Sequence, residues 1–284
     1  EVGYVQFDAG SEVLADIRTN KPLSEWIVQA VSGTDMAARL KAVRILAEQE
    51  ETPEIRNALI RALGDEYDFV RLNAIAVVAA FAPEDVTVRR ALVQMASEDS
   101  SARVRAAAVS GLSAAPPEDA LVDGTLRDAL RDSSYAVVAA AVRAYGPRRP
   151  EAALTDFQHL FAIDSWRSRV ELALLDVLPD IGLDERAVTL LDRFGMPERD
   201  VIVRLGVART LGRLGLDFQD DRMTALSRRL LEDVSESVRF AAATSLQEAD
   251  VSLSESYIRG RLAEESSERV REALSQLLSD REHE

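Results

Sequence analysis

An arginine returns about every 33 residues along this chain of 284 residues. The slots are occupied by Arg39, Arg71, Arg105, Val138 (the one slot without arginine), Arg169, Arg204, Arg239 and Arg271. A repeat of this length is typical of helical repeat proteins, in which each unit buries its apolar side only against its neighbours. We therefore predict an all-α fold, an α-α superhelix of stacked helix pairs, with most of the chain building an extended surface.

Prolines mark where the first helix of each pair is expected to begin, because proline is tolerated in the first turn of a helix. They lie at Pro22, Pro53, Pro83, Pro116, Pro117, Pro147 and Pro150. Together with the arginines they predict about eight pairs, with first helices beginning near residues 22, 53, 84, 117, 150, 184, 218 and 252. The second helices are predicted to begin near residues 35, 67, 101, 134, 165, 199, 235 and 267.

An acidic residue precedes most of these slots by six positions. The acidic residues are Asp65, Asp99, Asp132, Glu198, Asp233 and Glu265, and the exceptions are Gly33 and Ile163. At this offset the carboxylate lies in the turn before the second helix, where it can cap free N–H groups. The arginine can reach its own turn or the carboxylate of the neighbouring repeat, so we expect a ladder of ion pairs. The alternative is an arginine array that grips an acidic partner, but such an array would not need a carboxylate at a fixed offset.

Composition limits the classes of partner. The net charge of −15 disfavours binding to nucleic acid or to anionic membranes, which requires clustered basic residues. No apolar run approaches the roughly 20 residues of a membrane-spanning helix. The absence of cysteine excludes disulfides and thiolate metal sites and leaves the redox compartment open.

Lysine occurs only at Lys21 and Lys41, which fits either GC-rich coding bias or adaptation to high salt. A melting temperature that rises steeply in molar salt would favour salt adaptation.

The sequence contains no catalytic constellation. The motifs H-E-x-x-H, G-x-S-x-G, G-x-x-x-x-G-K and G-x-G-x-x-G are all absent. The two histidines are His159, which we expect to be packed or interfacial, and His283 in the polar tail. Trp26 and Trp166 are expected to pack between helices. No residue is therefore assigned as catalytic, cofactor-binding or metal-binding.

The two ends of the chain differ from the repeat. Residues 1–20 are predicted to contain a short β segment, because Tyr4–Phe7 alternates, turn residues follow, and Val13–Ile17 reads as a second strand. An isolated hairpin is marginal in water, so this segment should pack on the first helix pair or on an upstream domain. We assign residues 1–20 to the end of a preceding β-sandwich or a linker hairpin, and residues 21–284 to the repeat domain. The last helix is more polar than the others and is expected to form a C-terminal cap.

Two resemblances add to this interpretation. The helix-pair pattern of residues 22 to 280, with Asp in the turn and Val-Arg in the second helix, resembles HEAT repeats of the short bacterial type. This resemblance implies a HEAT-like solenoid. The front segment is similar to a junction in aminopeptidase N-like zinc metallopeptidases (gluzincins), where a β-sandwich leads into a helical-repeat tail. The matching residues are Tyr4-Val5-Gln6-Phe7-Asp8-Ala9-Gly10, Val13-Leu14, Lys21-Pro22 and Glu25-Trp26, with Ala9 in place of the usual proline and Ala15 in place of a frequent lysine.

The second resemblance implies that the chain is the non-catalytic C-terminal domain of such a peptidase and begins within a longer protein. It would pack on the upstream catalytic domain and limit peptide access, and zinc is implied only for that upstream domain. The first alternative is a free-standing HEAT-repeat scaffold or adaptor that binds a protein or peptide. The second is a HEAT-like enzyme, such as a bilin lyase-type protein or a DNA glycosylase, and the acidic balance argues against DNA.

Overall fold

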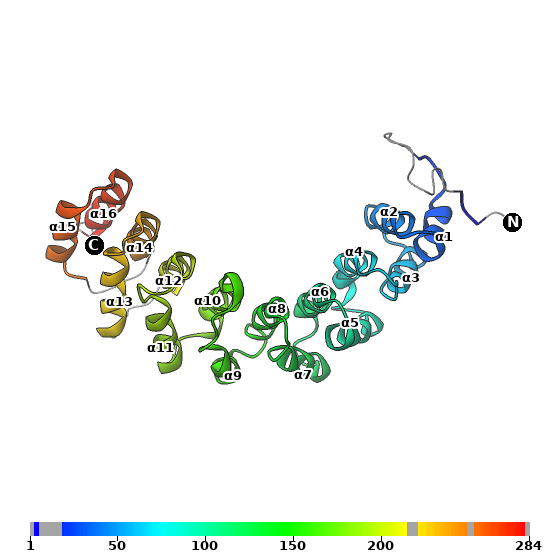
Figure 1. Ribbon diagram of the computed structural model, residues 1–284, viewed down its shortest axis with the longest axis horizontal. Coiled ribbons are helices and arrows are strands. Elements are labelled where there is room, and N and C mark those ends of the chain that lie inside the picture. Colours follow the sequence, from blue (N-terminus) through cyan, green and yellow to red (C-terminus); the bar gives the residue numbers. More distant parts are fainter. Residues whose placement is uncertain (1–2, 6–18, 215–220, 249–252, 282–284) are drawn as a thin grey trace. The chain divides into compact units, whose positions relative to one another are not determined.

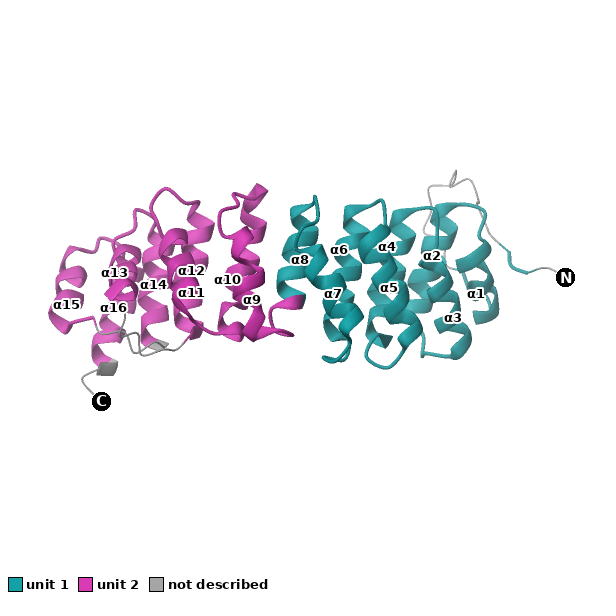
Figure 2. Cartoon of the chain, turned by 90° about the horizontal axis from the view of Figure 1, so that it is seen from below, with its two compact units in different colours: residues 1–144 teal, residues 145–284 magenta. Residues whose placement is uncertain are grey.

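The computed structural model describes residues 3–5, 19–214, 221–248 and 253–281. Within these residues the chain forms sixteen α-helices and four short 3-10 segments, and no β-strand. The all-α fold of about eight helix pairs is therefore confirmed for the described residues. The chain divides into two compact units, residues 1–144 and 145–284 (Figure 2).

The first unit is a stack of antiparallel helix pairs (Figure 1). The pairs are α1 with α2, α3 with α4, and α5 with α6, and α4 also packs on both α2 and α6. The even-numbered helices thus form one layer and the odd-numbered helices the other. The helices of this unit are α1 (Leu23–Ser32), α2 (Met36–Ala47), α3 (Pro53–Ala62), α4 (Asp68–Val78), α5 (Val86–Glu98), α6 (Ala102–Gly111), α7 (Ala120–Ala129) and α8 (Tyr135–Tyr145).

The second unit repeats the same two-layer arrangement. Helices α10, α12, α14 and α16 pack on one another in order, and α11, α13 and α15 each pack on the even-numbered helix that follows them. The helices of this unit are α9 (Pro150–Asp156), α10 (Arg169–Ile181), α11 (Glu185–Phe194), α12 (Val201–Leu214), α13 (Asp221–Leu231), α14 (Glu236–Glu248), α15 (Glu255–Glu264) and α16 (Glu268–Arg281).

The predicted helix starts are confirmed to within four residues. Pro53 and Pro150 occupy the first helical turn as expected. At α5 and α7 a carboxylate cap fixes the start a few residues after the proline. Asp85 accepts hydrogen bonds from the N–H groups of the first turn of α5, and Asp119 does the same for α7. A polar cap supplies an acceptor that proline lacks, so the helix begins at the cap.

Small residues bring the helices of one layer close together. Ala42, Ala74 and Ala108 are fully buried at corresponding places in α2, α4 and α6. In the second unit a Cβ added to Gly212 would lie 2.8 Å from the Cβ of Ser245, so α12 and α14 approach at a point where only glycine fits. Each helix buries its apolar stripe against its neighbours, which explains why the repeat must be copied.

Residues 3–5, the described N-terminal part of the front segment, contact the first helix pair. Val5 N–H donates to Glu25 Oε2 at 3.2 Å, and the Lys21 ammonium donates to Val5 O at 3.2 Å. The same ammonium lies 3.9 Å from the ring centre of Trp26, which is buried as expected. Residues 3–5 are not in a strand, and the rest of the expected β segment, residues 6–18, lies outside the described residues. The domain boundary at residue 20 stays a prediction.

None of the described helices combines the length and the apolar character needed to cross a bilayer. No group of three or more His, Asp or Glu side chains in the described part of the chain is arranged to hold a metal ion.

Candidate functional site

The recurrent arginines lie at the fourth position of the even-numbered helices and join consecutive repeats. In α4, Arg71 Nε and Nη2 donate to the two carboxylate oxygens of Asp99, each at 2.8 Å. The remaining nitrogen, Nη1, donates to the carbonyl oxygen of Asp65 in the preceding turn at 2.7 Å. Asp99 in turn accepts the N–H of Ser101 at 2.9 Å. One arginine therefore donates hydrogen bonds both to the turn before its own helix and to the turn of the next repeat.

Five rungs of the ladder have this geometry. They are Arg39–Asp65, Arg71–Asp99 and Arg105–Asp132 in the first unit, and Arg204–Asp233 and Arg239–Glu265 in the second. No side chain in these rungs is more than 14% exposed. The predicted ladder is confirmed at these positions, and its arginines are occupied within the fold rather than available to an acidic partner.

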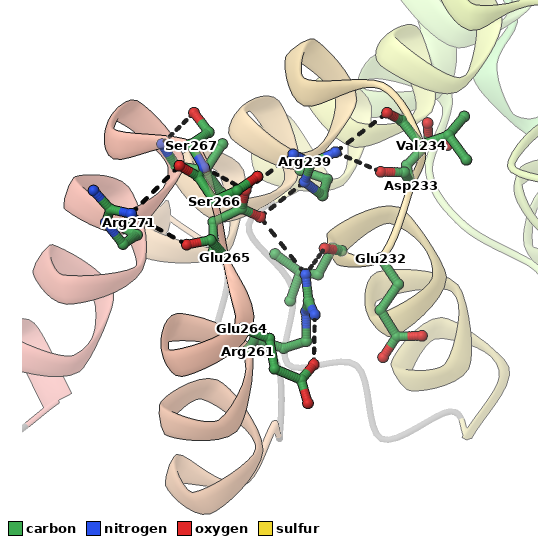
Figure 3. A network of polar contacts seen from close by, with 12 residues as sticks. Glu232, Asp233, Val234, Arg239, Arg261, Glu264, Glu265, Ser266, Ser267 and Arg271 are labelled. Carbon is green, nitrogen blue, oxygen red and sulfur yellow. Dashed lines mark hydrogen bonds and ion pairs between the residues drawn. The ribbon is translucent and has the colours of Figure 1, made fainter.

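The last rung shows how strongly the carboxylate is held (Figure 3). Glu265 accepts hydrogen bonds from Arg239 Nε at 2.8 Å and Nη2 at 2.9 Å, and from Ser267 N–H at 2.9 Å. Arg261 Nη2 lies 3.6 Å from the same carboxylate. These interactions, and chiefly the hydrogen bonds from Arg239, lower the pKa of Glu265 to about 2. In α16, Arg271 Nη1 donates only to the carbonyl oxygens of Glu265 and Ser266.

The predicted rung between Arg169 and Glu198 is absent. Arg169 is the first residue of α10 rather than the fourth, because the turn before it leaves the helical conformation. Arg167 and Ser168 both have positive φ, of 58° and 53°, which is uncommon for residues with a side chain. The guanidinium of Arg169 lies 5.5 Å from the ring centre of Trp166 instead.

A buried polar cluster holds this unusual turn. Glu171, which is 2% exposed, accepts the Ser165 N–H at 3.0 Å and also accepts the Ser165 hydroxyl. Ser165 Oγ accepts the N–H of Val170 at 2.9 Å. The turn therefore closes through Ser165 and Glu171, in the repeat whose acid slot is occupied by Ile163. Trp166 is directed outward, with 63% of its side chain exposed.

Exposed aromatic side chains gather at the starts of the even-numbered helices. We define the turn edge as the residues in or immediately before the first turn of α4, α8, α10, α12 and α14 that are large, apolar and exposed. They are Tyr67, Phe69 and Tyr135 in the first unit, and Trp166, Val201, Ile202 and Val234 in the second. All the large exposed aromatic residues in the described part of the chain lie on this edge. Each unit thus exposes large apolar groups at this place in its repeat, and in the first unit Leu23, Val28, Val86 and Leu121 are exposed elsewhere.

The sequence prediction for Trp166 is wrong. Trp166 does not pack between helices, because two left-handed residues follow it and the chain turns away from the helical path. His159 is exposed in a 3-10 segment whose buried residue is its neighbour Leu160, so it is not packed in the core, and its interfacial role stays a prediction. His283 lies outside the described residues. The expected exposure of the outer face of the last helix is confirmed at Glu268 and Glu272.

Sequence reasoning missed two features. A second series of ion pairs joins the odd-numbered helices, where Arg56 reaches Asp85 at 3.3 Å and Arg89 reaches Asp119 at 2.9 Å. Both arginines occupy the fourth position of their helix, as the arginines of the ladder do. This shared position could have predicted the second series from the sequence. The turn edge was also detectable, because its aromatic residues lie two to four positions before a slot of the repeat.

Ser168→Gly is expected to stabilise the second unit. A left-handed residue with a Cβ costs about 1–2 kcal/mol, and glycine removes this cost while adding about 0.5–1 kcal/mol of unfolded-state entropy. The net gain in unfolding free energy should be about 0.5–1 kcal/mol, measured by urea unfolding. The matched control is Ser237→Gly in the first turn of α14, which should destabilise. A loss of stability in Ser168→Gly would contradict the left-handed turn.

Comparisons with known proteins agree with this architecture. A family model described as HEAT repeats matches residues 24–113. The X-ray structure of YibA from E. coli is similar with a TM-score of 0.61 and 17% identity, covering 85% of this chain and 86% of that one. Kap121p bound to Nup53p is similar with a TM-score of 0.52 and 14% identity, covering 91% of this chain and 32% of that one. No curated protein sequence matches. These likenesses concern the fold alone.

Proposed function

We propose that this HEAT-repeat α-α solenoid is a non-catalytic scaffold that binds a protein or peptide partner through its turn edge. The observation that carries the proposal is the exposure of Tyr67, Phe69, Tyr135 and Trp166 at one recurring place. Aromatic residues are enriched at protein interfaces because each buries a large area at small entropic cost.

The distribution of the arginines supports the same proposal. Their pairing within the ladder leaves the repeat rigid, and binding to a rigid surface costs little ordering entropy. Kap121p has a similar fold and is bound to another protein, Nup53p, in the structure named above. That example supports protein binding as a use of the fold and says nothing about the partner of this chain.

Photo-crosslinking at defined positions tests the proposal. A photoreactive phenylalanine analogue would replace Phe69 or Tyr135 on the turn edge, and Leu121 at the start of α7 as an equally exposed control. In cells of the source organism the two edge positions should crosslink to the same protein, which the control position should not capture. That protein, once purified, should bind the chain and lose affinity for Phe69→Ser. Equal capture from all three positions, or no specific product, would contradict the proposal.

A narrower proposal rests on the resemblance of Tyr4–Trp26 to the junction of gluzincin peptidases. In that case the first partner is a zinc aminopeptidase domain in the same protein, and the solenoid limits access to it. None of the solved structures named above is a peptidase, so the broader scaffold proposal is better supported. An H-E-x-x-H motif in the reading frame upstream of Glu1 would support the narrower proposal, and its absence there would end it.

A further inference from the structure

We propose that the turn formed by Ser165–Arg169 is a binding site for an acidic, apolar segment of a partner protein. Trp166 supplies the apolar contact, and Arg167 and Arg169 supply the contacts to carboxylates. This inference deepens the proposed function, on which it rests, by assigning the site and the chemistry of the partner.

The cations around Trp166 differ from the other arginines of the repeat. The guanidinium carbon of Arg167 lies 4.5 Å from the ring centre of Trp166, and that of Arg169 lies 5.5 Å away. Both arginines are exposed, and neither forms an ion pair with a described residue. The nearby Asp164 and Glu171 carboxylates are instead bound to Arg199. Two cations without carboxylate partners therefore flank the exposed indole.

The site is held in place before any partner binds. Ser168 and Arg167 occupy left-handed backbone conformations, which persist only where the surrounding structure determines them. Here the buried Ser165–Glu171 cluster fixes the turn. Residues in strained conformations concentrate at binding sites, and an exposed Trp with adjacent Arg has the composition of an interface hot spot.

The charge of the two arginines determines which kind of partner segment the Trp166 turn would bind. The chain as a whole carries a net charge of −15, which would attract basic segments to most of its surface. The Trp166 turn instead presents two arginines that no described carboxylate pairs, whereas the arginines of the five rungs are neutralised. A guanidinium recognises a carboxylate through paired hydrogen bonds. A segment in which Asp or Glu adjoins a large apolar residue satisfies both the arginines and the indole.

Selection from a random peptide library tests this inference with the full chain. A phage-displayed library of random twelve-residue peptides would be panned against the purified protein, and the selected peptides labelled for fluorescence polarisation. We expect enrichment of Asp or Glu next to aromatic or large aliphatic residues. Trp166→Ala should weaken binding at least tenfold, and Arg167→Gln with Arg169→Gln at least fivefold. Trp166→Phe should retain more affinity than Trp166→Ala, and binding should weaken as salt rises.

Matched variants keep the test specific. Arg90→Gln with Arg131→Gln removes the same charge from exposed positions in the first unit, and Tyr135→Ala removes another exposed aromatic residue. Both should leave the affinity unchanged. Because Trp166, Arg167 and Arg169 are exposed, their variants should keep the melting temperature of the parent. The inference is overturned if no peptide is selected, if basic or neutral peptides dominate, or if the Trp166 and arginine variants bind as well as the parent.

The two experiments distinguish a failure of the Trp166 binding site from a failure of the scaffold proposal. If the crosslinked partner still binds through Phe69 and Tyr135 while the Trp166 variants bind it normally, the scaffold proposal stands and the Trp166 turn is not its binding site. If neither experiment detects binding, both proposals fail.

Discussion

Arg204→Met is expected to lower the unfolding free energy of the second unit by about 3–5 kcal/mol, the usual cost of removing one partner of a buried ion pair. Arg204 Nε lies 2.6 Å from Asp233 Oδ2, and Nη2 lies 3.0 Å from Oδ1. The two side chains are only 7% and 6% exposed. Without the arginine, the Asp233 carboxylate stays buried, and among the described residues its remaining donor is the N–H of Ser235 at 2.8 Å. Urea unfolding monitored by far-ultraviolet circular dichroism measures the loss.

A double-mutant cycle separates the ion pair from the packing of its side chains. Asp233→Asn keeps the acceptor for Ser235 but removes the charge, so Arg204→Met with Asp233→Asn leaves no buried ion unpaired. We expect the double variant to be more stable than the sum of the two single changes predicts, by about 2 kcal/mol or more. Arg259→Met is the control, because its ion pair with Glu255 is more than half exposed and should contribute less than about 1 kcal/mol. Equal losses from Arg204→Met and Arg259→Met would contradict the structural role of the ladder.

The fold could be predicted because the sequence repeats with a fixed period and because the acidic residues and arginines of neighbouring repeats form ion pairs. Five of the six carboxylates that lie six positions before an arginine bind the arginine of the previous repeat, as in Arg39–Asp65, and Glu198 is the exception. This rule accounts for both exceptions in the acid slots. Gly33 belongs to the first repeat of the printed sequence, and about one period before Arg39 the sequence has no arginine. Ile163 belongs to the repeat that follows Val138, the slot without arginine, so the missing carboxylate follows the missing arginine.

The candidate site could be predicted less well, since it depends on departures from the repeat. The pattern placed Arg169 in a rung and Trp166 between helices. Two left-handed residues, Arg167 and Ser168, and a turn closed by Ser165 and Glu171 changed both positions. Left-handed conformations of residues other than glycine have no clear sequence signal, because they are imposed by tertiary contacts. The sequence shows that Ile163 replaces the acidic residue of the repeat. It does not show that the following turn adopts left-handed backbone conformations.

Acid is expected to unfold the protein through the ladder. The pKa of Glu265 is lowered to about 2, and that of Asp132 is also lowered, chiefly by its hydrogen bond with Arg105. Both groups bind protons more weakly in the folded state than in the unfolded chain. The contribution of Glu265 to stability is therefore complete above its unfolded pKa of about 4.5 and is lost as the pH falls toward about 2, and that of Asp132 is lost as the pH falls below its unfolded pKa of about 3.8.

We therefore expect the melting temperature to fall steeply between about pH 4.5 and pH 2. Each rung joins two repeats, so protonation of one carboxylate weakens the interface between two helix pairs, and stability in a stacked repeat depends on those interfaces. Arg239→Met with Glu265→Gln removes one titrating rung and should make the pH dependence shallower, although the variant is less stable at neutral pH. Arg259→Met with Glu255→Gln, which removes an exposed pair, should leave the slope unchanged. A melting temperature that is constant or rises over this range would show that the rungs do not link the repeats.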